Sequence, residues 1–319
     1  MRRILMYTHD TMGLSHTWRM LYIASCLAGR MQDVSILLLT DLSIVGRLKF
    51  PINVDYVHLP GIVLGDNQQY CARNLNVELK KVRAITLPDL ELVDNGGIEA
   101  FGGEDERRPM GIALYKRPKD GEIFVIVSRK KGPSGRYLWQ YRLQDEGSGT
   151  IRLTRVREFG EWSGEGEIEA VAVDDALGYV YYSDEQFGIR KYHADPDAAN
   201  SNKELAVFGT EGFAEDREGI SIYAINDGTG YIIVSDQQAN EFRIYTREGA
   251  PDNPHNHKLV KIVNLATKSS DGSEITNSVL NNVFSAGLFV AMSDDKTFHF
   301  YAWPAIAGND LIVAPNGVR

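Results

Sequence analysis

The chain has 319 residues, 43% of them hydrophobic and 24% charged, with a formal net charge of -9 and a pI near 5.3. This acidic balance excludes nucleic acid as the expected partner and favours divalent cations or basic surfaces. The apolar run at the amino terminus, Ile4–Tyr7, is too short for an export signal or a membrane-spanning segment. The sequence therefore predicts no membrane contact and leaves the compartment unassigned.

The first 92 residues predict a small α/β segment. Short apolar strands are expected at Ile4–Tyr7, Val34–Leu39 and Val54–Leu59, with one amphipathic helix at His16–Ala28. The order strand, loop, helix, strand indicates a parallel, Rossmann-like unit. Because the helical pattern stops after Leu90, the unit is expected to be incomplete.

This segment resembles the start of MurG-like, GT-B-type glycosyltransferases. The resemblance lies in the loop with Gly13, Ser15 and His16, in Thr40–Asp41, and in the phrase VDYVHLPGI at Val54–Ile62. It implies glycosyl transfer from a sugar nucleotide, with His16 near the acceptor. Such a transferase binds its nucleotide mostly through a second Rossmann-like domain, and none is predicted here. An incomplete structural unit, the remnant of a fusion, is therefore the favoured interpretation.

Residues 93–108 are rich in glycine and charge and predict a junction, after which one phrase occurs four times. Each copy has an apolar strand, a turn, a glycine that opens a second strand ending in serine, and a third strand ending in tyrosine. The glycines are Gly121, Gly178, Gly230 and Gly287, the serines are Ser128, Ser183, Ser235 and Ser293, and the tyrosines are Tyr141, Tyr192, Tyr245 and Tyr301. A period of about 50 residues with four strands per unit is typical of β-propeller blades.

We therefore expect residues 109–319 to form about four antiparallel blades, which makes the chain mainly β. The innermost strands should include Ala170–Val173 and Gly219–Tyr223. The outer, fourth strands are expected at Ile151–Arg157, Leu205–Phe208, Leu259–Leu265 and Leu311–Ala314.

Acidic residues recur where innermost strands are expected to begin. They are Glu169, Asp216, Glu218, Asp271 and Glu274. In a propeller these strand ends meet at one mouth of the central channel, where like charges repel unless protons or a cation compensate them. Calcium takes six to eight oxygen ligands in flexible geometry and suits scattered carboxylates. The alternative is that the acids cap turns or pair with Arg129, Lys130, Arg190 and Arg217.

Three phrases resemble the β-propeller phytases. They are EAVAVDDALGYVYYSDE at Glu169–Glu185, DREGISIY at Asp216–Tyr223, and GLFVAMSDDKTFHFYAWPAIA at Gly287–Ala307. The resemblance implies a six-bladed, calcium-dependent phosphomonoesterase that hydrolyses phytate, inositol hexakisphosphate. Calcium at the channel mouth would bridge the substrate phosphate and an attacking water, which offsets phosphate charge and lowers the pKa of the water.

The same resemblance implies roles for individual residues. Glu169 and Glu185 are implied as catalytic, metal-binding acids, and Lys130 as a catalytic lysine that contacts phosphate with Arg129 beside it. The further calcium ligands implied are Asp216, Glu218 and Asp271. A lactonase-type propeller hydrolase would share the acids without needing the two cations. A non-catalytic propeller would keep the repeat and discard the metal.

The family's first two blades are not accounted for before Met110. Their absence would remove cations and metal ligands, so we expect reduced phytase activity unless a second copy of the chain completes the ring. The expected partner is a small phosphorylated molecule. Members of the family are commonly exported, whereas no export signal is visible here.

Overall fold

The computed structural model describes residues 2–8, 15–30, 34–40, 49–51, 54–58, 62–64, 70–72, 81–82, 97–147, 150–294 and 297–314. It divides into two compact units, Met1–Leu79 and Lys80–Arg319. The functional boundaries at residues 92 and 108 stay predictions. Of the helices that the structure describes, none is long and apolar enough to cross a membrane.

The first unit holds a parallel sheet with one helix. Strands β1 (Arg2–Thr8), β2 (Val34–Thr40) and β3 (Val54–His58) pair in that order, and α1 (Ser15–Arg30) connects β1 to β2. Ala24 of the helix packs with Ile36 and Val54 of the sheet. The elements follow the predicted order, and the Rossmann-like assignment stays a prediction.

Short antiparallel pairs follow this sheet along the chain. Strand β4 (Ile62–Leu64) pairs with β5 (Tyr70–Ala72), and in the second unit β6 (Lys81–Val82) pairs with β7 (Ile98–Glu99). Gly13, Asp41 and residues 93–96 of the predicted junction lie outside the described residues.

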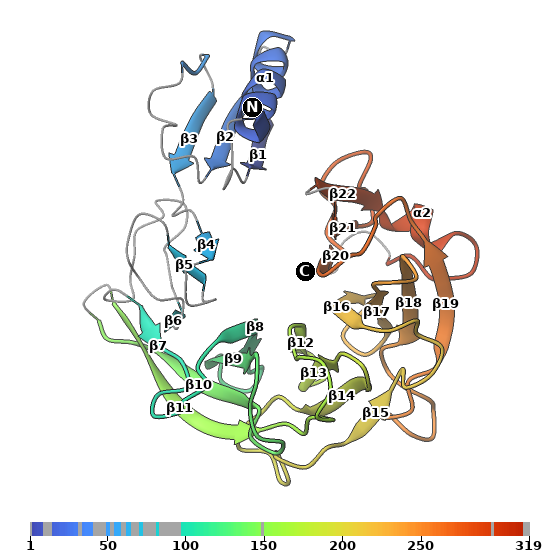
Figure 1. Ribbon diagram of the computed structural model, residues 1–319. Coiled ribbons are helices and arrows are strands. Elements are labelled where there is room, and N and C mark those ends of the chain that lie inside the picture. The colour runs from blue at the N-terminus through green and yellow to red at the C-terminus, as the bar shows by residue number, and fades with distance from the viewer. Residues whose placement is uncertain are drawn as a thin grey trace. The chain divides into compact units, whose positions relative to one another are not determined.

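The rest of the second unit is a succession of antiparallel sheets, each a meander of consecutive strands (Figure 1). Sheet A contains β8 (Pro109–Lys116), β9 (Ile123–Arg129), β10 (Leu138–Asp145) and β11 (Ile151–Phe159). Sheet B contains β12 (Val171–Asp174), β13 (Tyr179–Asp184), β14 (Gly188–His193) and β15 (Ala206–Phe208). Sheet C contains β16 (Arg217–Ala224), β17 (Gly230–Asp236), β18 (Glu241–Thr246) and β19 (Leu259–Asn264). Sheet D contains β20 (Ser273–Thr276), β21 (Leu288–Ser293) and β22 (Thr297–Ala302).

The first strand of each sheet lies on the inner side of this array. Strand β12 contacts β8 and β16, and β16 contacts β20, so the four first strands follow one another side by side (Figure 1). The predicted innermost segments Ala170–Val173 and Gly219–Tyr223 correspond to β12 and β16. The four-blade arrangement predicted from the repeat is therefore confirmed.

The predicted fourth strand of the last blade, Leu311–Ala314, is wrong. After β22 the chain forms a short helix, α2 (Trp303–Ala307), and residues 311–314 then run without strand pairing. Leu311 and Ala314 are buried in the core between sheets C and D. The Tyr223 hydroxyl accepts a hydrogen bond from the Ala314 backbone N–H at 2.9 Å. The apolar pattern of this segment thus reports packing against a neighbouring sheet.

Aromatic side chains fill the spaces between neighbouring sheets. Tyr182 and Tyr192 of sheet B stack in the core that also holds Phe124 and Phe159 of sheet A. Between sheets C and D, Tyr223 stacks on Trp303 with ring centroids 4.2 Å apart. Large buried rings of this kind typically stabilise a fold by about 3–5 kcal/mol each against truncation to alanine.

The repeated serines tie each sheet to the next. Ser128 donates a hydrogen bond to the Ile168 carbonyl, Ser183 to the Glu218 carbonyl at 3.0 Å, and Ser235 to the Ser270 carbonyl at 2.8 Å. Each bond joins the end of a second strand to the start of the following inner strand. The repeat therefore fixes how the turn after a second strand meets the next sheet.

Two of the repeated glycines, Gly230 and Gly287, stand at positions where a side chain would not fit. A Cβ at Gly230 would lie 2.2 Å from the Tyr223 carbonyl oxygen, and one at Gly287 would lie 2.2 Å from that of Thr276. Both residues also have positive φ, which glycine adopts without steric strain.

Candidate metal centre

Side chains of the candidate site come from two recurring positions. Lys130, Glu185 and Gln237 are the first residues after the second strands of sheets A, B and C. Opposite them, Glu169 precedes β12 and Glu218 lies on β16, where the inner strands of sheets B and C begin. The serine hydrogen bonds described above hold each turn against the following inner strand. Residues far apart in sequence therefore meet at one end of the array.

Three of the predicted acids converge. One carboxylate oxygen from each of Glu169, Glu185 and Glu218 lies within 4.8 Å of the other two. Glu185 and Glu218 are buried and Glu169 is half-buried. Three ionised carboxylates this close, partly withdrawn from water, are unfavourable unless protons or a cation compensate them.

The pKa values of the three glutamates reflect this unfavourable crowding of carboxylates. Burial, and then the charges of Glu185 and Glu169, raise the pKa of Glu218 to about 9. Burial also raises the pKa of Glu169 to about 7, helped by the neighbouring Glu167 carboxylate, to which protonated Glu169 can donate a hydrogen bond. The pKa of Glu185 is raised to about 7 by burial, against a lowering hydrogen bond from the Glu167 backbone N–H at 2.7 Å. Each carboxylate is thus easier to protonate than usual, because burial and the neighbouring acids disfavour its charged form.

Several oxygens of this region have no hydrogen-bond partner among the described groups. Glu167 Oε2, Asp216 Oδ1 and Glu218 Oε2 are buried and unpartnered. A buried carboxylate oxygen without a donor is costly, and a hard cation coordinated by oxygen removes that cost. The donor set, all carboxylate oxygens in irregular positions, suits calcium better than the strict octahedron of magnesium. The residues present therefore fit the metal that the family resemblance implied.

Asp216 and Asp271 lie outside the group of three but act on it. Both raise the pKa of Glu218 electrostatically. Gln238 donates to Asp216 Oδ2 at 2.7 Å, and Gln237 donates to Asp271 Oδ1. These two aspartates, which precede the inner strands of sheets C and D, thus form the outer part of the same acidic cluster.

Lys130 and Arg129 occupy different surroundings. Lys130 is half-exposed and forms an ion pair with Glu167 at 2.6 Å, at the start of sheet B. Arg129 has a side chain only 1% exposed, pairs with Glu104 at 3.1 Å and lies over the Phe101 ring. The resemblance implied substrate contact at both residues, which stays a prediction, and the Lys130 side chain is the more exposed of the two.

The alternative pairing of the acids with arginines is not what the structure contains. Arg190 pairs with Asp184 and Glu204, and Arg217 donates to backbone carbonyls, including those of Glu185 and Gly209. Among the described residues, no lysine or arginine forms an ion pair with the three converging glutamates. These acids are therefore not explained by ion pairing.

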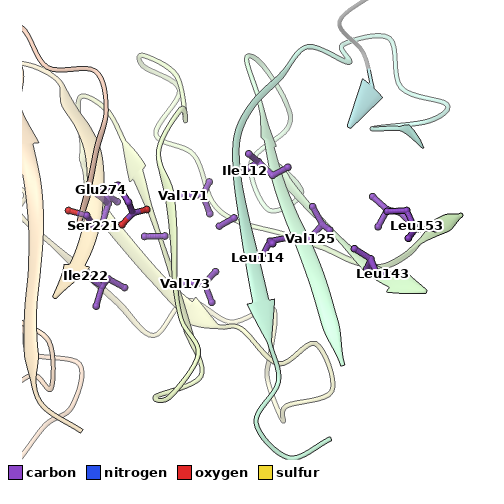
Figure 2. A pocket seen from close by; sticks show the side chains of 14 residues that line it. Ile112, Leu114, Val125, Leu143, Leu153, Val171, Val173, Ser221, Ile222 and Glu274 are labelled. Atoms are coloured by element: carbon purple, nitrogen blue, oxygen red, sulfur yellow. The ribbon is translucent and has the colours of Figure 1, made fainter. Parts of the chain in front are cut away.

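Behind the acids the inner strands are apolar. A cavity of about 640 Å³ lies between them, and its lining includes Ile112 and Leu114 of β8, Val171 and Val173 of β12, and Ile222 of β16 (Figure 2). Glu274, which the sequence placed with the acids, instead lines this cavity from β20, and burial raises its pKa. An apolar wall lowers the local dielectric and so strengthens electrostatic interactions nearby.

Two residues of the site were not predicted from the sequence. Glu167 contacts Lys130 through its side chain and Glu185 through its backbone N–H. Gln238 holds Asp216. Glu167 precedes β12 by a few residues, so a search of the whole acidic run before that strand would have included it. The contact of Gln238 depends on the register of two strands and leaves no signal in the sequence.

Comparison with known proteins finds a family match for the second unit. The family model described as Phytase matches residues 103–303. The 3-phytase of Bacillus subtilis (strain 168) is 27% identical over 207 residues, which cover 62% of this chain and 52% of that protein. The chain thus spans about half the length of this curated relative.

Two solved structures match the chain at low similarity. One is titled "Structure of U3-55K", with a TM-score of 0.38 and 11% identity over 62% of this chain and 53% of that one. The other is titled "Crystal structure of RRP9 WD40 repeats", with a TM-score of 0.36 and 12% identity over 62% of this chain and 52% of that one. Likenesses this partial carry no argument about function.

Proposed function

The chain belongs to the phytase family, and from that premise we propose that it is a calcium-dependent phosphomonoester hydrolase acting on phytate. The observation that carries the proposal is the convergence of Glu169, Glu185 and Glu218, three acids without an ion-pair partner in the described part of the chain. A phosphorylated substrate is itself anionic, so such a site can receive it only with a cation present.

Each acid has a role in this proposal. Glu169, Glu185 and Glu218 would hold calcium, with Asp216 and Asp271 as outer ligands. When bound, calcium would offset phosphate charge and lower the pKa of a water for in-line attack. Glu169 and Glu185, the two acids that the resemblance implied as catalytic, would also accept the proton that this water loses.

Lys130 would contact a phosphate oxygen. Its ammonium group is half-exposed at the edge of the acidic cluster, where Glu167 holds it at 2.6 Å. A lysine is a mobile point charge and can turn from Glu167 to an arriving phosphate. We assign Arg129 a supporting role, because its guanidinium is enclosed by Glu104 and Phe101.

The extent of the activity is part of the proposal. The chain spans about half of its curated relative, and we propose that these 319 residues, tested on their own, hydrolyse phytate more slowly than a six-bladed member. Loss of one preorganised charge-stabilising group typically lowers kcat by about 10²- to 10³-fold. A second copy of the chain that completed the ring would restore part of this. The glycosyltransferase resemblance of residues 1–92 stays a prediction, since the family match begins at residue 103.

The test is phosphate release from phytate by the full chain, in calcium and in chelator, with the oligomeric state measured by light scattering. We expect calcium-dependent release that Glu218→Gln abolishes and Glu211→Gln, the same change at an exposed acid, leaves intact. Hydrolysis of lactones but not of phytate would support the lactonase reading. Calcium binding without either activity would leave a non-catalytic propeller.

A further inference from the structure

Gln238 has contacts that neither the sequence nor the family match assigned. Its amide oxygen accepts a hydrogen bond from the Asp216 backbone N–H at 2.8 Å, and its amide nitrogen donates to Asp216 Oδ2 at 2.7 Å. A backbone N–H can only donate, so the amide oxygen must face it. The amide nitrogen is then left for the carboxylate, which fixes the orientation of both groups.

The consequence falls on the other oxygen of Asp216. Oδ2 is occupied by Gln238, whereas Oδ1 is buried and has no hydrogen-bond partner among the described groups. Asp216 also lies beside both acids of the group, because the backbone N–H of the next residue, Arg217, donates to the Glu185 carbonyl at 3.0 Å and Glu218 follows two residues after Asp216. A carboxylate fixed through one oxygen presents the other in a single direction.

The turn that carries Gln238 is itself held. The Asn240 N–H donates to the Gln237 carbonyl at 3.2 Å, and Asn240 has φ of 57°, a conformation that asparagine tolerates. Asn240 Oδ1 accepts from the Ser269 N–H at 2.8 Å, which ties the turn to the segment that leads into sheet D. Gln237 continues the link, because it accepts a hydrogen bond from the Gln238 amide and donates one to Asp271.

We propose that Gln238 is a positioning residue of the metal centre, which holds Asp216 so that Oδ1 is directed to a calcium ion. The inference rests on the proposed calcium site and assigns to Gln238 no contact with the metal or the substrate. It predicts that calcium affinity depends on the amide of Gln238 although that amide is exposed.

Sheet B supplies a matched control. Gln186 follows Glu185 as Gln238 follows Gln237, in the turns SDEQ and SDQQ. Both glutamines are exposed, but within the described residues Gln186 makes no side-chain hydrogen bond to an acid. Substitution by methionine keeps the length of either side chain and removes its hydrogen bonds.

The test measures calcium binding by the metal-free full chain with titration calorimetry, together with Tm before calcium is added. We expect Gln238→Met to weaken calcium affinity about 10- to 100-fold with the metal-free Tm unchanged, and Gln186→Met to change neither. Unaltered calcium affinity in Gln238→Met would overturn the inference while leaving the proposed function standing. No calcium binding by the parent chain would overturn both.

A double variant distinguishes a Gln238 that acts through Asp216 from a Gln238 that binds the metal itself. If Gln238 acts through Asp216, then in an Asp216→Ala chain the further change Gln238→Met should alter calcium affinity by less than about 2-fold. A 10-fold effect in that background would mean that Gln238 acts on the metal without Asp216, and the proposal would be wrong.

Discussion

The acids of sheets B and C fall into two groups with opposite surroundings, and in sheet B neighbouring residues, Asp184 and Glu185, belong to different groups. Asp184 and Asp236 are fully buried and pair with Arg190 and Arg243 at 2.8 and 3.0 Å. Glu185, the residue after Asp184, has no such partner within the described chain and faces Glu169 and Glu218. Arg190 and Arg243 therefore pair with the fully buried aspartates and not with the three converging glutamates. The contrast indicates that the unpaired group is left for a charge from outside the chain.

The largest effect should come from breaking a structural pair. Arg247 holds Asp174 through two hydrogen bonds of 2.6 Å, with both side chains 2% exposed. Arg247→Met would leave a buried, unpaired carboxylate and should lower the free energy of unfolding by about 3–5 kcal/mol, with or without calcium. Arg152→Met, which breaks an exposed pair, should change it by less than about 1 kcal/mol. Equal losses in denaturant titrations of the two variants would remove the distinction.

Neutralising an unpaired acid should instead raise the free energy of unfolding of the metal-free chain. Glu218→Gln removes a carboxyl group whose pKa burial and neighbouring acids raise to about 9, so its ionised form is disfavoured in the folded chain. We expect the metal-free chain to gain about 1–2 kcal/mol at pH 8 and to lose most of its stabilisation by calcium. Thermal melts with and without calcium measure both effects. A variant that responds to calcium as the parent does would disprove the ligand assignment.

The same acids predict a pH dependence of stability in the metal-free chain that calcium should counteract. Glu169 and Glu185 have pKa values raised to about 7 and Glu218 to about 9, so the folded state binds more protons than the unfolded state above the usual glutamate range. Stability of the metal-free chain should therefore fall as pH rises from about 5 to 9. Calcium requires the ionised form, so its stabilising effect should grow over the same interval. Calcium-induced shifts in Tm that shrink with rising pH would contradict this.

The smallest effect on stability is expected at Lys130. Its ion pair with Glu167 is partly exposed, and pairs of this kind are worth about 0–1 kcal/mol. Lys130→Met should therefore leave Tm and calcium affinity nearly unchanged, while raising KM for phytate because a phosphate contact is lost. Lys131→Met, at the next position, is the control. A large loss of Tm would show that Lys130 is structural.

The sequence predicted the sheets better than the contacts between them. The glycines, serines and tyrosines of the repeat mark strand ends locally, which is why the strands of sheets A, B and C were found within a few residues. The strand prediction for Leu311–Ala314 was wrong because an apolar run that packs as a loop has the same sequence pattern as a short buried strand. This segment packs against Tyr223 of sheet C. Glu169 and Glu218 could be chosen from their places at strand starts. The contacts of Gln238 and the enclosure of Arg129 could not be predicted, because their partners come from other segments of the fold.

The serine hydrogen bonds between sheets make this unit a row of neighbours in which each sheet depends on the next. Opening sheet C would break two of these bonds, those from Ser183 and to Ser270, whereas opening sheet D would break one within the described chain. Unfolding in such a row spreads from the ends. Amide hydrogens of β20–β22 should then exchange with solvent before those of β16–β18, through partial opening events. Asp271 lies at that boundary, so the first opening event would release the outer edge of the acidic cluster while Glu169, Glu185 and Glu218 remain together.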